Sequence, residues 1–143
     1  MPARLACALL VWSGSFCSTR ADAENWPQWR GPRGDGTSHE QNVPLRWNGE
    51  TGENVLWKVA VPGVGHASPI LWGERIFLAS CLEETQERIL LCLDRDSGKT
   101  LWQQTVITAP LETGHALNSH ASSTPATDGE LVFVTFLEID GRT

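Results

Sequence analysis

The chain has 143 residues, enough for one ordinary domain at most, and it carries a net charge of −6 at pH 7. Such an acidic chain without a basic stripe argues against a nucleic-acid surface, which needs clustered Lys and Arg to neutralise phosphates. The composition is globular, and the 13 Gly, 8 Pro and 7 Trp indicate short strands and turns rather than long helices.

Residues 1–23 have the pattern of a secretory signal peptide. Arg4 supplies the positive start, a short apolar run extends from Leu5 to Phe16, and Ala21-Asp22-Ala23 fits the small-x-small cleavage pattern. We therefore expect cleavage before Glu24 and a periplasmic or secreted protein. The apolar run is too short to span a bilayer, so no transmembrane segment is expected after cleavage. An ordinary buried N-terminal element is the alternative.

Residues 24–55 are expected to be irregular, because Gly and Pro interrupt both helix and strand there. Trp26 and Trp29 in this stretch are interpreted as packing anchors. From residue 56 the pattern becomes all-β, with no sustained helical period. The expected strands are Val55 to Val61, Ala67 to Trp72, Arg75 to Cys81, Ile89 to Leu93 and Lys99 to Val106. Turns are expected at 83–87 and 94–98.

The β pattern repeats along the chain. Leu56-Trp57 recurs as Leu101-Trp102 after 45 residues, and Ser68-Pro69 recurs as Thr124-Pro125 after 56 residues. The 11 additional residues fall in an inserted loop at 109–119. A period near 45 residues with about four short strands per unit is typical of propeller blades.

One unit resembles the Trp-docking repeat of pyrroloquinoline-quinone-like (PQQ-like) propellers, whose pattern is roughly Ala-x-Asp-x-x-Thr-Gly-x-x-x-Trp. The matching positions are Asp94, Ser97, Gly98 and Trp102, with Cys92 at the Ala position. The earlier copy around Trp57 departs from this pattern, since it has Asn48 at the Asp position. The opening Trp26-Pro27-Gln28-Trp29-Arg30-Gly31-Pro32 is similar to the start of exported PQQ-like proteins of planctomycete type.

The resemblance implies an all-β fold, a β-propeller of four-stranded antiparallel blades, with PQQ-like repeats over residues 56–143. In such a repeat Gly98 would take a positive φ and Asp94 would accept hydrogen bonds from the turn. Trp102 would be buried between blades, at a cost of about 3–5 kcal/mol if truncated to Ala. The length accommodates one full blade, about 67–106, and the front half of another, ending in a turn at Asp140-Gly141. A segment with such exposed sheet edges is expected to associate.

Three functions fit the resemblance. The first is a binding or scaffolding module of the cell envelope, like the propeller subunit of the outer-membrane β-barrel assembly machine, with a protein or small-molecule ligand. The second is a quinoprotein oxidoreductase that uses PQQ and Ca²⁺ to oxidise an alcohol or sugar. The third is a structural module fused to a catalytic domain. We expect no cofactor and no enzyme activity under the first, because no Cys-Cys pair or calcium-ligand set accompanies the repeat.

Candidate ligand-binding residues lie in two loops that precede corresponding strands. They are His66, His115, Asn118 and His120. A propeller would place both loops at the same end of the molecule. The three imidazoles lack the carboxylate or Cys spacing of a metal site, so no metal is assigned. Ser122 and Ser123 lie near His120 without a triad motif, and no catalytic residue is assigned.

Two cysteines remain after leader removal, Cys81 and Cys92, on either side of an expected hairpin. The exported compartment permits a disulfide, and the strand register decides whether the pair comes close enough. A cross-strand disulfide and two buried free thiols are both open.

Overall fold

The computed structural model describes residues 23–115 and 117–138. The expected leader up to residue 22 and the expected turn at Asp140-Gly141 lie outside these residues. The described chain is all-β, as predicted. Its strands are β1 (Ile70–Trp72), β2 (Arg75–Leu82), β3 (Glu87–Asp94), β4 (Thr100–Thr108), β5 (Ala126–Thr127) and β6 (Val132–Phe133). Nothing in the described ranges is a helix long and apolar enough to cross a membrane.

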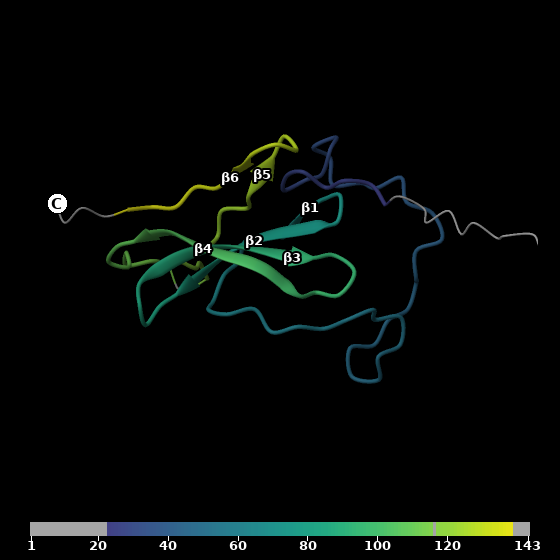
Figure 1. The fold of residues 1–143 in the computed structure, drawn as a ribbon, viewed down its shortest axis with the longest axis horizontal. Coiled ribbons are helices and arrows are strands. Elements are labelled where there is room, and N and C mark those ends of the chain that lie inside the picture. The colour runs from purple at the N-terminus through teal and green to yellow at the C-terminus, as the bar shows by residue number, and fades with distance from the viewer. Residues whose placement is uncertain (1–22, 116, 139–143) are drawn as a thin grey trace, which may run out of the picture.

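Strands β1 to β4 form one antiparallel sheet in chain order, which Figure 1 shows at the centre of the molecule. The predicted strands in β2, β3 and β4 are confirmed, and so are the turns that join them. The sheet follows from the sequence because each connection is short enough to force the next strand to return beside the last.

Both faces of this sheet are covered along β2 and β3, whereas β4 is largely exposed. Residues 89–93 of β3 are all buried, which confirms the prediction made from their continuous apolar run. We call the sheet β1 to β4 the first unit and residues 120–138 the second unit. One face of the sheet presents Phe77, Leu90 and Cys92 to Val132 and Val134 of the second unit. On the other face, Ser80 Oγ donates a 2.6 Å hydrogen bond to the carbonyl of Pro62, so the chain before β1 lies there. Figure 1 shows this chain running along the side of the sheet away from β5 and β6.

The second unit lies beside the first through contacts between equivalent positions. The N–H of Ser68 donates to Thr124 Oγ1, 56 residues later, at 3.1 Å. The N–H groups of His66 and Ala67 both donate to the carbonyl of Ala121 at 3.0 Å. The repeat offset found in the sequence is therefore also a spatial relationship.

The N-terminal segment joins both units. The backbone N–H and C=O of Trp26 exchange hydrogen bonds with Leu71, which lies in β1. One residue later, the carbonyl of Pro27 accepts from Thr127 in β5 at 2.9 Å. The expectation that Trp26 anchors this segment by packing agrees with its position, whereas Trp29 is 66% exposed.

The prediction of a strand from Val55 to Val61 is wrong. No strand of the described chain lies beside this segment to form a ladder, and it is extended coil instead. The strand predicted from Ala67 to Trp72 is shorter than expected and begins at Ile70. The N–H groups of Ala67 and Ser68 donate to the second unit, and Pro69 has none, so this part cannot pair with β2.

The turn at residues 94–98 has the geometry that its sequence predicts. The carboxylate of Asp94 accepts hydrogen bonds from the N–H and hydroxyl of Ser97, and these bonds hold its pKa below the ordinary value. Gly98 has φ 68°, in the left-handed region that favours glycine.

The indole of Trp57 lies on this turn. Its Nε1–H donates to the carbonyl of Arg95 at 2.8 Å, and a Cβ placed on Gly98 would lie 2.5 Å from Cε3 of the ring. Trp57 comes from the copy of the repeat that precedes the sheet. An indole from one unit therefore contacts the turn of the next.

Trp102 is less buried than expected. It is 39% exposed, and its ring lies 6.0 Å from that of Phe77 at a tilted angle. A cavity of about 320 Å³, lined also by Gly129, Leu131 and Val132, borders it. In the described chain, the second unit covers part of the indole and leaves the rest in solvent.

Cys81 and Cys92 are free and buried, which resolves the alternative left open by the sequence. Cys92 pairs with Phe77, whereas Cys81 pairs with Arg88. The two cysteines are therefore displaced by four residues along adjacent strands, or about 13 Å, too far for a disulfide.

Replacing Trp57 with Ala should lower the free energy of unfolding by about 2–3 kcal/mol, because a partly buried indole and its hydrogen bond are lost. Gly98→Ala should cost about 2 kcal/mol, from the positive φ and the collision with the ring. In the double variant there is no ring for the new Cβ to collide with. Its total loss of unfolding free energy should therefore be smaller than the sum of the losses in the two single variants. Urea denaturation measures all three variants, and strictly additive costs would contradict the contact.

Both thiols should resist modification in the native protein. Burial raises the pKa of Cys81 and of Cys92, so little thiolate forms at neutral pH. A chromogenic disulfide reagent should react with these two cysteines in leader-free protein after denaturation and much more slowly before. Recovery of a Cys81–Cys92 disulfide peptide by mass spectrometry would contradict the strand register.

Candidate functional site

The two loops that carry the predicted ligand-binding residues lie side by side. The N–H of His66 donates to Ser119 Oγ at 3.0 Å, which joins the loop before β1 to the loop before β5. The sequence placed these loops at one end of the molecule, and in the structure they are in direct contact. The repeat is the reason, because both loops precede equivalent strands.

A cavity of about 520 Å³ opens between these loops; we call it the loop cavity. Its lining residues are Gly63, Val64, Gly65, His66, Glu83, Asn118, Ser119 and His120. Three of the four predicted residues thus line one cavity. The fourth, His115, lines an adjoining cavity of about 290 Å³ that shares Asn118, Ser119 and His120 with the first.

A chain of charged side chains extends from the core to the loop cavity. It begins at Arg88 in β3, whose side chain is 0% exposed. Nη2 of Arg88 donates to Glu112 Oε2 at 2.8 Å, and its guanidinium also donates to the carbonyls of Ala109 and Pro110. The inserted loop is therefore fixed to the sheet by one buried cation.

His120 lies between two carboxylates. Its Nδ1 is 3.2 Å from Glu112 Oε1, and its Nε2 is 3.9 Å from Glu83 Oε1. Nδ1 is buried and not aligned for a hydrogen bond. Burial raises the pKa of Glu112, but its own backbone N–H and the neighbouring His120 and Arg88 outweigh burial, so the pKa lies below the ordinary value. The carboxylate is thus ionised at neutral pH.

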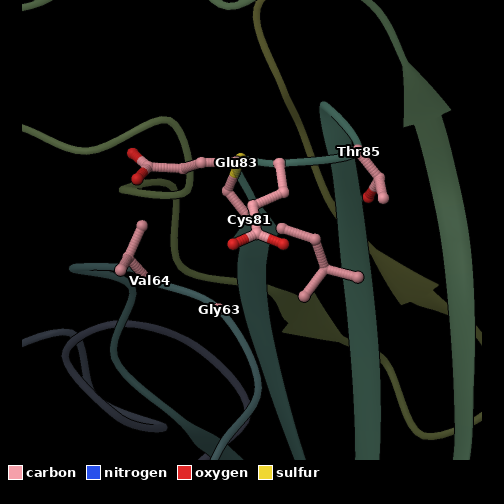
Figure 2. A pocket seen from close by; sticks show the side chains of 7 residues that line it. Gly63, Val64, Cys81, Glu83 and Thr85 are labelled. Atoms are coloured by element: carbon pink, nitrogen blue, oxygen red, sulfur yellow. The ribbon is translucent and has the colours of Figure 1, made fainter.

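A second cavity, of about 390 Å³, shares Gly63, Val64 and Glu83 with the loop cavity. Figure 2 shows the Gly63–Val64 loop facing the turn between β2 and β3, which carries Glu83 and Thr85. The backbone approaches closely here, since a Cβ on Gly63 would lie 2.2 Å from the carbonyl oxygen of Cys81. Gly63 has φ 77°, in the left-handed region that favours glycine, and its lack of a Cβ permits this approach.

One of the two serines near His120 in the sequence contacts another hydroxyl. Ser123 Oγ is hydrogen-bonded to Thr135 Oγ1 at 2.7 Å, so its hydroxyl is engaged away from an imidazole. In the described part of the chain, no group of three or more His, Cys, Asp or Glu side chains is arranged to hold a metal ion. Imidazole, amide, hydroxyl and carboxylate groups around one cavity suit a polar ligand.

Sequence reasoning missed Arg88, Glu112 and Glu83. Arg88 had a detectable signal, because it alternates with Leu90 and Cys92 and so occupies an inward position of its strand. A charged residue at an inward position predicts a buried partner. The sequence does not indicate that Glu112 is this partner, because Glu112 lies in an inserted loop whose fold no local pattern specifies.

The chain was compared with protein-family models, with curated proteins and with solved structures, and no match was found.

Replacing Glu112 with Gln should lower the free energy of unfolding by about 2 kcal/mol, because the buried Arg88 charge loses its counter-ion. In an Arg88→Met background the same change should cost much less. Since the folded pKa of Glu112 is depressed, its contribution is present above the unfolded value of about 4.3 and lost as pH falls through the folded value.

Urea denaturation between pH 3 and pH 7 checks this, with the exposed Glu130→Gln as control. An equal effect of Glu112→Gln in both backgrounds would rule out the coupling to Arg88.

Proposed function

We propose that this chain belongs to an exported β-propeller of PQQ-like repeats that acts as a binding or scaffolding module of the cell envelope. Three features support the proposal. They are the leader pattern, the four-stranded antiparallel sheet, and the contact between repeat-equivalent residues of successive units. The ligand is a protein or a small molecule that enters at the loop cavity.

The observation that carries the proposal is the position of Trp57. In a propeller each unit is wedged against the next, and a large aromatic side chain fills the gap between them. Trp57 comes from the copy before the sheet, and its Nε1–H donates to Arg95 in the turn of the sheet itself. Trp102 occupies the equivalent position one unit later.

The loop cavity supports a binding role. Loops at one end of a repeat array vary without disturbing the strands, so ligand sites concentrate there. The extra residues of the second unit fall in this loop, and Arg88 holds them in place through Glu112. The imidazole, amide, hydroxyl and carboxylate groups on the cavity wall can donate and accept hydrogen bonds.

The full gene product, purified from the envelope, provides the test. Wild-type protein should retain a stoichiometric envelope component, and a variant with His66, Asn118 and His120 all changed to Ala should lose it. His39→Ala, on the exposed N-terminal loop, is the matched control and should retain it. The same protein should show no dye-linked alcohol oxidation after addition of PQQ and Ca²⁺. Oxidation that depends on both would replace the binding function with that of a quinoprotein dehydrogenase.

A further inference from the structure

Glu24 is held by its side chain in the N-terminal loop, residues 24–40. Its carboxylate accepts hydrogen bonds from both terminal nitrogens of Arg33, from Ser38 Oγ at 3.2 Å and from the N–H of His39 at 3.4 Å. The hydrogen bonds from Arg33 come first among the causes that lower the pKa of this carboxyl to about 2. The side chain is thus a fixed anion paired with a cation.

The backbone nitrogen of Glu24 faces a second carboxylate, that of Glu40. The N–H of Glu24 donates to Oε1 of Glu40, whose carboxylate lies at the other end of the loop. Within a peptide bond this nitrogen is neutral, so the carboxylate receives a hydrogen bond without a charge. As a free amino terminus it would be a cation, because an α-amino group has a pKa of about 7.7–8.0 and is mostly protonated at neutral pH.

We propose that the mature protein begins at Glu24 and that its α-ammonium group forms an ion pair with Glu40, closing the N-terminal loop. The leader peptidase adds water across the bond between Ala23 and Glu24. Ala23 takes the new carboxylate, and the nitrogen of Glu24 becomes the ammonium. Glu24 is then paired at both ends, its side chain with Arg33 and its amino group with Glu40. The sequence pattern predicts cleavage at this bond, and the structure places the nitrogen that cleavage would free against the carboxylate of Glu40.

The closed loop has a structural consequence. Trp26, two residues after Glu24, exchanges backbone hydrogen bonds with Leu71 of β1. Its ring lies within 3 Å of a Cβ placed on Gly31. Closing the loop at Glu24 and Glu40 therefore holds the segment that joins both units of the sheet. This inference rests on the export leader that the proposed function also assumes, but not on the binding role of the loop cavity.

The first experiment identifies the terminus. The full gene product is exported with its own leader, purified and sequenced from its amino end. The expected sequence is Glu-Asn-Trp. A terminus at any other residue overturns the proposal.

The second experiment tests the ion pair. The full chain beginning at Glu24 is prepared with a free α-amino group and, as a matched form, with that group acetylated. Trypsin cleavage after Arg33 reports opening of the loop. Glu40→Gln should raise the cleavage rate about two- to fivefold in the free form, as expected for a partly exposed ion pair, and should have little effect in the acetylated form.

Glu53→Gln, in a distant turn, is the control and should leave both rates unchanged. Acetylation alone should raise the rate as much as Glu40→Gln does. An equal effect of Glu40→Gln in the two forms, or no effect of acetylation, would show that the amino group does not pair with Glu40.

Discussion

The arrangement depends on contacts made by one unit on the next. A four-stranded sheet has two apolar faces, and it cannot bury both by itself. In this protein one face is covered by Val132 and Val134 of the following unit, and the other by the chain that precedes β1. Trp57 fixes that preceding chain at the turn of the sheet, through a hydrogen bond and close contact with Gly98.

The candidate site is a result of the same repetition. Because the loops at His66 and at His120 precede equivalent strands, the packing of the units brings them together. The insertion then adds Glu112, which joins the buried Arg88 to the cavity wall. A cation fully enclosed in the sheet thereby orients a loop that is otherwise free to vary. If a ligand binds here as proposed, the ordered loop lowers the entropic cost of binding.

Local patterns predicted the central sheet well. The alternation from Arg75 to Cys81, the apolar run at 89–93 and the Asp-x-x-Ser-Gly turn each favour one conformation. The predictions that failed depend on contacts between residues that lie far apart in the sequence. The segment at 55–61 is apolar enough for a strand, yet no neighbour pairs with it among the described residues. The pairing of Arg88 with Glu112 depends on how the inserted loop folds back, which no local pattern encodes.

The most direct test of the account is an experimental structure of the full gene product that shows the surroundings of Trp102. If the units repeat as proposed, its indole lies on a glycine of positive φ in the turn of the next unit, with Nε1–H donating to a turn carbonyl, as Trp57 does at Gly98. An indole of Trp102 still open to solvent in that structure, or packed against a helix, would contradict the account.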